Sequence, residues 1–292
     1  MNLKLVSVIM PTYMQDRLFH KAVESVLAQT YANFELIIID DNKDIDYQNK
    51  NKQYVSSLKD NRVCYLQNEN NIGSAKSRNK GIFQAKGDYI TFLDDDDFYA
   101  PFKLEKQVEV MEKTNCEVSI CNLIMTNERG KIIDKRQRKF FSNKEPLLNL
   151  HLKYHITGTD TMMFQSEYLR KIGGFDGIDL GDEFYLMAKA IQNNAKIEHV
   201  DYDGAYGITH NESGLSGFKS KLKAEEQIYL FKQKYFTELT RKDIRFIKMR
   251  HYAVKAVAYK KGRKFIKCAG ALIVSFFSSP IGFFKLYRGD CR

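Results

Sequence analysis

Three short apolar runs in the first hundred residues each end in a cluster of polar side chains. The runs are residues 5–10, 34–39 and 88–93, and the clusters that follow them are residues 11–13, 40–41 and 94–97. Continuous apolar runs of this length are typical of strands that are buried on both faces of a parallel sheet. Ligands bind beyond the carboxyl ends of such strands, so we expect the three clusters to converge on one site.

Stretches with helical periodicity lie between these strands. We predict helices at residues 17–29, 74–85 and 102–113, and a further short strand at residues 63–66. Strands that alternate with helices predict an α/β fold, with a mostly parallel central sheet flanked by helices. In the second half, residues 118–125 and 131–133 have the pattern of a hairpin, and residues 182–193 that of a helix. From residue 219 onward the pattern is mostly helical and basic, which predicts a C-terminal helical extension.

Four consecutive aspartates at residues 94–97 are the most specific chemical signal in the chain. Adjacent carboxylates repel one another, and a hard divalent cation such as Mn²⁺ or Mg²⁺ offsets this repulsion. In an extended chain alternate residues face the same way, so Asp94 pairs with Asp96, and Asp95 with Asp97. The alternative interpretation is an exposed acidic turn or a helix N-cap.

Four motifs, in this order and spacing, resemble the family 2 glycosyltransferases, which have the GT-A fold. They read VSVIMPTY, FELIIIDDN, NENNIGSAKSRNKGIFQAKGDYITFLDDDD and GGFDGIDLGDEFYLMAKA. The resemblance extends over roughly residues 4–220, and it is the common order of four weak motifs that makes it specific. It implies a GT-A, Rossmann-like fold and a nucleotide-sugar donor.

The resemblance implies a role for each matching residue. The base and ribose would be held by Pro11, Thr12, Tyr13 and Asp41. Lys76 and Arg78 match positions of cations near the base or diphosphate, and the alternative for both is a surface charge on a helix. Asp95 would meet the ribose or the metal. Asp96 is the preferred metal ligand, supported by Asp94 and Asp97, and His210 matches a late histidine on the metal or diphosphate, although a lone loop histidine is more often neither.

An acidic pair precedes the helix predicted at residues 182–193. By resemblance, Asp182 or Glu183 is the general base that takes the proton of the acceptor hydroxyl, and Asp182 is preferred. The other member would be a carboxylate stabilised by the helix N-terminus.

The function implied is inverting transfer of a sugar, with UDP-sugar as the expected donor. The expected acceptor is a hydroxyl of a lipid-linked saccharide in O-antigen, lipopolysaccharide or capsule biosynthesis. Two other functions remain open: a non-catalytic nucleotide-sugar-binding subunit of a polysaccharide assembly complex, and a sugar-phosphate nucleotidyltransferase. The chain has no Trp, which excludes the Q-x-x-R-W motif of processive synthases.

The basic character of the chain lies in its last 52 residues. Residues 241–292 hold 14 Lys and Arg against 2 Asp and Glu, a charge of +12, whereas residues 1–240 hold 32 against 34. Beside these charges lies an apolar run at residues 269–284, interrupted by Pro280. The pattern fits a helix at an anionic membrane surface, a segment that packs as ordinary core, or a solvated helix face, and nucleic acid is not the expected partner.

The expected organisation is a catalytic domain at residues 1–220 and a basic helical extension at residues 221–292. Residues 1–115 would be the nucleotide-binding half of the catalytic domain, and residues 116–220 its acceptor-binding half. No secretory signal or clean membrane span is recognised, so the expected location is the cytoplasm or, through peripheral contact, the inner face of the membrane.

Overall fold

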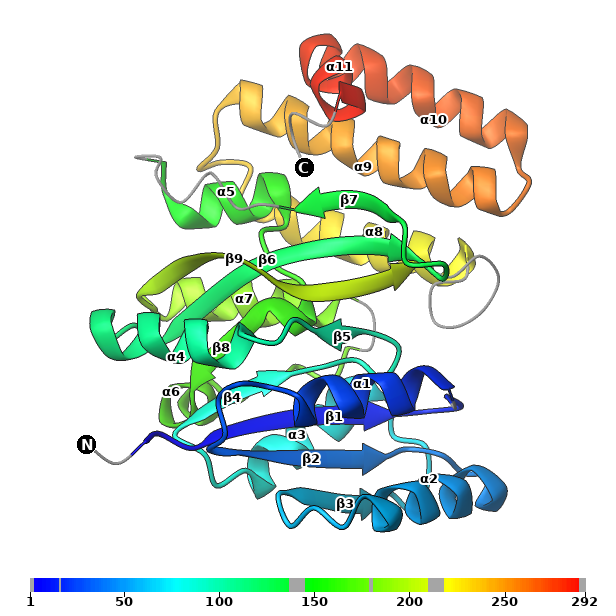
Figure 1. Cartoon of the computed structure of the whole chain (residues 1–292). Coiled ribbons are helices and arrows are strands. Elements are labelled where there is room, and N and C mark those ends of the chain that lie inside the picture. Colours follow the sequence, from blue (N-terminus) through cyan, green and yellow to red (C-terminus); the bar gives the residue numbers. More distant parts are fainter. Residues whose placement is uncertain (1–2, 16, 137–144, 179–180, 210–217, 289–292) are drawn as a thin grey trace. The chain divides into compact units, whose positions relative to one another are not determined.

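The computed structural model describes residues 3–15, 17–136, 145–178, 181–209 and 218–288 (Figure 1). The chain forms two compact units. The first comprises residues 1–141 and 157–209, and the second comprises residues 142–156 and 210–292. Residues 142–156 group with the C-terminal segment, which the sequence pattern did not indicate.

The first unit begins with a parallel sheet, as predicted. Its strands are β1 (Val6–Thr12), β2 (Phe34–Asp40), β3 (Val63–Gln67) and β4 (Tyr89–Phe92). They pair in the order β3-β2-β1-β4, so their carboxyl ends lie at one edge. Pro11 was expected to end the first strand but lies within it, paired with Ile39. The strand tolerates Pro11 because β4 pairs with β1 only as far as Ile9.

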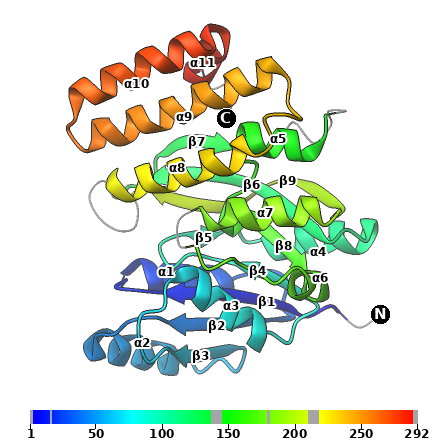
Figure 2. The same ribbon diagram turned by 180° about the vertical axis from the view of Figure 1, so that it is seen from behind.

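Helices cover both faces of this parallel half (Figures 1 and 2). Alternate residues of β1 point to opposite faces, so Val6, Val8 and Met10 pack with the buried stripe of α1 (Arg17–Leu27). The helix α4 (Lys103–Thr114) shares that core. On the other face lies α3 (Ser74–Gln84), where Gly81 approaches Ile9 so closely that a Cβ at Gly81 would meet the Ile9 side chain at 2.5 Å.

The rest of the sheet is mixed in direction. It contains β5 (Phe98–Tyr99), β6 (Val118–Asn127), β7 (Ile132–Arg136), β8 (Met162–Gln165) and β9 (Ile197–Thr209). Strand β8 joins β4 and β6 by antiparallel pairing, and β9 runs parallel to β6 and pairs with β5 at the edge. The predicted hairpin is present as β6 and β7. The α/β class is therefore confirmed, with the parallel pairing concentrated in β1–β4.

Four further segments of the first unit complete the frame of the site. They are α2 (Ile45–Leu58), the 3₁₀ turn η2 (Thr159–Thr161), α6 (Ser166–Lys171) and α7 (Asp182–Gln192). The turn η2 contacts β4, β6 and β9, so its residues reach the acidic segment that follows β4.

The second unit is helical, as the sequence predicted for the C-terminal segment. It contains α5 (Leu147–Tyr154), α8 (Phe218–Gln233), α9 (Arg241–Lys261), α10 (Phe265–Ser278) and α11 (Pro280–Arg288). Lys153 of α5 forms ion pairs with Glu145 and with Asp243 of α9. Among the described residues no single helix is long and apolar enough to cross a membrane; residues 265–278 and 280–286 reach that length only as a pair, bent by 117°.

Candidate active site

A pocket of about 300 Å³ lies beyond the carboxyl ends of β1 and β2. Its lining residues are Tyr13, Met14, Asn42, Lys43, Asp44 and Tyr47. The backbone N–H of Met14, a residue with a φ of +54°, donates a 2.7 Å hydrogen bond to Oδ1 of Asn42. This bond ties the loop after β1 to the loop after β2, and the Tyr13 ring stays half exposed at the pocket wall. The pocket has the aromatic and polar lining that a nucleotide base requires.

Asp41 is buried and organises the loop before α3. Its carboxylate accepts hydrogen bonds of 2.9 Å from the backbone N–H groups of Ile72 and Gly73, and one of 2.8 Å from Nδ2 of Asn68. The preceding Asp40 is fully buried and accepts bonds from Asn42, Asn51 and Tyr65. Both carboxylates therefore fix the loops that border the pocket.

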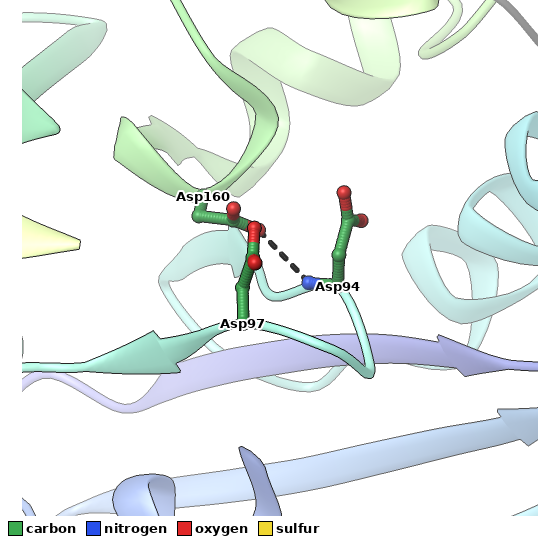
Figure 3. A group of neighbouring side chains, drawn as sticks. All are labelled: Asp94, Asp97 and Asp160. Atoms are coloured by element: carbon green, nitrogen blue, oxygen red, sulfur yellow. Dashed lines mark hydrogen bonds between the residues drawn. The ribbon is translucent and has the colours of Figure 1, made fainter. Parts of the chain in front are cut away.

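The acidic segment after β4 meets a third aspartate from η2. Oxygen atoms of Asp94, Asp97 and Asp160 lie within 4.8 Å of one another. Figure 3 shows the carboxylates of Asp97 and Asp160 side by side, with Oδ1 of Asp160 accepting a 2.8 Å bond from the backbone N–H of Asp94. The N–H of Ile208 in β9 donates to Asp97 at 2.7 Å. Three carboxylates at this spacing suit a hard divalent cation.

Burial and mutual repulsion disfavour the charged forms of these acids. Burial raises the pKa of Asp160 to about 7, with the charge of Asp94 adding to the effect. Burial and the neighbouring Asp160 raise the pKa of Asp97 well above its ordinary value. Burial, together with the charge of Asp96, raises the pKa of Asp95 to about 8. Binding of a cation or of protons to this cluster is therefore strongly favoured.

Asp95 links the acidic cluster to the pocket beyond β1 and β2. Its Oδ2 accepts a 2.9 Å hydrogen bond from the backbone N–H of Tyr13. Thr12 is buried at the end of β1, with Pro11 before it. Asp96 is half-buried and lies outside the group formed by Asp94, Asp97 and Asp160.

Arg78 of α3 is the central cation of the site. Its Nη1 donates to Oδ2 of Asp182 at 2.6 Å, and its Nη2 donates to Oδ1 of Asp94. The guanidinium is buried, 4% exposed, and lies over the Phe175 ring at 5.4 Å from the ring centroid. Arg78 thus joins the acidic segment to α7. Lys76, by contrast, is exposed, with its Cε close to Gly177.

The loop before α7 is held to α3 by Asn79. Its side-chain amide donates to the carbonyl of Phe175 at 2.8 Å and accepts from the N–H of Phe175 at 2.9 Å. Gly174 has a φ of +60°, and a Cβ there would meet Oδ1 of Asn79 at 2.5 Å, so both its conformation and its space favour glycine.

Asp182 and Glu183 form the first turn of α7. Burial raises the pKa of Asp182 to about 7, although the charge of Arg78 opposes the shift. Burial also raises the pKa of Glu183. The N–H of Glu183 donates to Oδ1 of Asp182 at 2.8 Å. Each carboxylate oxygen of Asp182 therefore accepts a hydrogen bond, Oδ1 from Glu183 and Oδ2 from Arg78.

The structure thus brings together Tyr13, Arg78, Asp94, Asp95, Asp97 and Asp182 through direct contacts. His210 lies outside the described residues. Sequence reasoning missed Asp160, which belongs to no acidic run and is 66 positions from its partner Asp94. Both Nη atoms of Arg78 bind carboxylates of the protein, and its expected place near the base or diphosphate stays a prediction.

Comparison with known proteins places these features in a family. The model of glycosyl transferase family 2 matches residues 7–173, and the chain belongs to this family. A 226-residue match to an uncharacterised glycosyltransferase of Methanocaldococcus jannaschii is 29% identical and covers 76% of this chain and 77% of the relative. The expected family is therefore confirmed.

Two Escherichia coli relatives match over shorter stretches. A putative colanic acid biosynthesis glycosyl transferase, WcaA, is 43% identical over 35% of this chain and 36% of its own length. The UDP-Glc:α-D-GlcNAc-diphosphoundecaprenol β-1,3-glucosyltransferase WfgD is 38% identical over 43% of this chain and 48% of its own. The matches thus span less than half of each relative.

Solved structures share the fold at low sequence identity. Residues 1–349 of Staphylococcus aureus TarS, in complex with UDP-GlcNAc, superpose with a TM-score of 0.58 at 17% identity, covering 96% of this chain and 92% of that one. The mannosyltransferase PcManGT of Pyrobaculum calidifontis, in complex with GDP-Man and Mn²⁺, has a TM-score of 0.56 at 15% identity. The match covers 94% of this chain and 73% of that one. These matches confirm the GT-A fold.

Proposed function

We propose that the chain transfers a sugar from a nucleotide-sugar, UDP-sugar being the preferred donor, to a hydroxyl of a saccharide acceptor with inversion at the anomeric carbon. The observation that carries this proposal is the bridge from Arg78 to both Asp94 and Asp182. The bridge holds a carboxylate suited to general-base catalysis beside the acidic cluster, as single-displacement transfer requires.

Asp182 is the proposed general base. A base works best when its pKa is near the working pH, and burial raises the pKa of Asp182 to about 7. The ionised carboxylate would take the proton of the acceptor hydroxyl while that oxygen attacks the anomeric carbon. Attack from the face opposite the leaving group inverts the configuration, so an α-linked donor would give a β-linked product. Glu183 is the proposed alternative base.

The donor would lie along the edge formed by the pocket and the acidic cluster. Tyr13, with Pro11, Thr12 and Asp41, is proposed to form the base and ribose site, and Lys76 to approach the diphosphate. Support comes from TarS, which binds UDP-GlcNAc, and from WfgD, which uses UDP-Glc. PcManGT binds GDP-Man, so a guanine donor is the alternative that the test must include.

A divalent cation, Mn²⁺ or Mg²⁺, is proposed at the acidic cluster. Asp94, Asp97 and Asp160 fit such a cation because all three offer carboxylate oxygens within 4.8 Å. Asp96 and His210 remain proposed ligands, Asp96 being partly exposed next to this group. When bound, the cation would neutralise charge that builds up on the diphosphate leaving group.

The proposed acceptor is a lipid-linked saccharide in surface-polysaccharide synthesis, at the cytoplasmic face of the cell membrane. WfgD acts on a diphosphoundecaprenol-linked sugar, and WcaA is named for colanic acid biosynthesis. Residues 1–115 are proposed as the nucleotide-binding half and residues 116–220 as the acceptor-binding half of the catalytic domain, with residues 221–292 as its extension.

A donor screen that measures release of nucleoside diphosphate tests the proposal. UDP- and GDP-sugars would be supplied with Mn²⁺, with and without saccharides linked to a polyprenyl diphosphate. We expect release from a UDP-sugar that depends on the acceptor and is lost in Asp182→Asn. Donor binding without any turnover would instead support a non-catalytic subunit, and formation of a nucleotide-sugar from a sugar phosphate would support a nucleotidyltransferase.

A further inference from the structure

Helix α10 carries its largest apolar side chains on the side away from α9. The side chains that are buried on α10 are small: Ala271, Ser275 and Ser278. Oγ of Ser275 donates to the carbonyl of Met249 in α9 at 2.8 Å, which fixes this side against α9. On a helix of a soluble bundle, the large apolar residues normally face the neighbouring helix. In α10 the arrangement is inverted.

The exposed side continues from α10 to α11 as one surface, which we call the apolar face. It consists of Ile266 (91% exposed), Ile273 (57%), Phe277 (72%), Ile281 (74%) and Phe284 (58%). Phe276 packs edge-on against both Phe277 and Phe284, which joins the two helices. A contiguous group of exposed apolar side chains of this size is typical of a surface that is covered by a membrane or by another molecule.

Exposed cations lie at one end of the apolar face. They occupy the last turn of α9, its connection to α10 and the first turn of α10, and we call them the basic rim: Lys260, Lys261, Arg263, Lys264 and Lys267. Lys285 lies exposed at the α11 end. The chain has no Asp or Glu between residues 244 and 289, so no acidic residue in this segment neutralises these cations.

We propose that the apolar face and the basic rim dock on an anionic lipid bilayer, with α10 and α11 lying in its interface. A helix of this kind places apolar side chains at the boundary between headgroups and acyl chains, while lysines and arginines meet anionic headgroups. The bend of 117° at Ser279 and Pro280 fits two short helices lying along a surface. The small residues towards α9 leave the large ones free for the lipid.

The chemistry of the surface favours lipid over two other occupants. A second copy of the chain, paired through the apolar face, would cover the apolar side chains but would offer the basic rim no acidic partner from this segment, which has no Asp or Glu between residues 244 and 289. A nucleic acid would bind the cations but leave isoleucine and phenylalanine side chains uncovered. An anionic bilayer satisfies both the charge and the apolar face.

Co-sedimentation of the full-length protein with vesicles tests the proposal. Vesicles of phosphatidylcholine alone and of phosphatidylcholine with 30% phosphatidylglycerol would be compared, the latter share being roughly that of an anionic leaflet. We expect binding to the anionic vesicles that weakens as salt is raised, and much weaker binding to the neutral ones. Vesicle binding requires neither donor nor acceptor, so its loss and a failure of sugar transfer are separate results.

Two variants separate the apolar from the charged contribution. The triple variant Ile266→Ser, Ile273→Ser, Phe277→Ser removes apolar side chains that make little contact with the protein, so it should fold normally and bind anionic vesicles about 100-fold more weakly. The variant Lys260→Glu, Lys264→Glu, Lys267→Glu should lose about 100-fold as well, since each cation near an anionic leaflet contributes about fivefold in affinity.

Matched controls use exposed residues outside this surface. Leu230→Ser in α8, where Leu230 is 60% exposed, should bind vesicles like the unaltered protein. Lys52→Glu, Lys59→Glu, Lys113→Glu gives the same change in net charge at exposed positions of the other unit and should also bind. Absence of binding at low salt, or full binding by the serine variant, would overturn the proposal. So would a dimer in solution that the serine variant dissociates while vesicles remain unbound.

Discussion

Nη1 of Arg78 donates a 2.6 Å hydrogen bond to Oδ2 of Asp182, across 104 positions of the chain. The same guanidinium also holds Asp94, so one side chain orients the proposed base and the acidic segment together. Both Arg78 and Asp182 are 5% exposed at the side chain, which shields the pair from water. The position of Asp182 therefore depends on α3, a helix from the N-terminal part of the first unit.

Arg78→Met should destabilise the fold and shift the pH dependence of transfer. Removing one partner of a buried ion pair typically costs about 3–5 kcal/mol, because the remaining charges stay buried. The charge of Arg78 lowers the pKa of Asp182, so this pKa should rise further when Arg78 is removed. The increase of kcat/KM with pH should then occur at higher pH. Denaturant unfolding and a pH–rate profile measure the two effects.

Arg62→Met is the matched control for this change. Arg62 also makes two hydrogen bonds to an aspartate, Asp60, but its side chain is 32% exposed. Exposed pairs of this kind are typically worth about 1 kcal/mol or less. An Arg78→Met variant with the stability and pH profile of Arg62→Met would exclude a positioning role for Arg78.

Asp182→Asn should lower turnover by about 10²–10⁴-fold and leave donor affinity nearly unchanged. Asparagine keeps the shape of the side chain and can still accept a bond from Arg78, but it cannot take a proton. Single-turnover rates and donor titrations measure the two quantities. If Glu183→Gln is inactive while Asp182→Asn turns over normally, the base is Glu183.

Tyr13→Ala should weaken nucleoside diphosphate binding and leave stability nearly unchanged. The ring is half exposed at the pocket wall, so its removal opens no cavity in the core. Stacking of a base on an aromatic side chain is worth about 1–3 kcal/mol, or about 5- to 150-fold in affinity. Calorimetric titration with UDP measures the loss. Phe83→Ala is the control, because Phe83 is 83% exposed on α3 outside the pocket.

The parallel half of the sheet could be predicted from the sequence because its strands are mostly apolar, and β1, β2 and β4 end at polar clusters. The helix α2 could not, since Asn51 is its only buried residue and the apolar side chains that it packs on the core, Tyr54, Val55 and Leu58, are confined to its C-terminal part. Strand β9 was missed because Asp201, Asp203 and Gly204 interrupt its pattern. Asp160 joins the site only through the pairing of β8 with β4, a contact that no local pattern reports.

Chelation should abolish transfer, and Mn²⁺ or Mg²⁺ should restore it. Asp160→Asn should raise the cation concentration for half-maximal activity by at least about tenfold, because it removes one charged ligand and keeps the volume. Asp96→Ala should lose most activity while the protein stays folded. Glu69→Gln changes an exposed carboxylate and should have no effect. Full activity in excess chelator would exclude a metal role for the cluster.

The stability of the cation-free protein should fall as the pH rises from about 4 to about 8. In the folded state the pKa values of Asp95 and Asp160 are raised to about 8 and about 7, against an ordinary value near 4. The folded protein therefore binds more protons than the unfolded chain in this window, and stability decreases with pH. Thermal unfolding in chelator measures the decrease.

A divalent cation should reverse this loss, and more so at high pH. The cation binds ionised carboxylates, so it competes with protons at pH 5 but meets a fully charged cluster at pH 8. The rise in melting temperature on adding Mg²⁺ should therefore be larger at pH 8 than at pH 5, and smaller in Asp160→Asn. Asp46→Asn, at an exposed position of α2, should behave like the unaltered protein. An equal Mg²⁺ effect at both pH values would mean that the cation binds elsewhere.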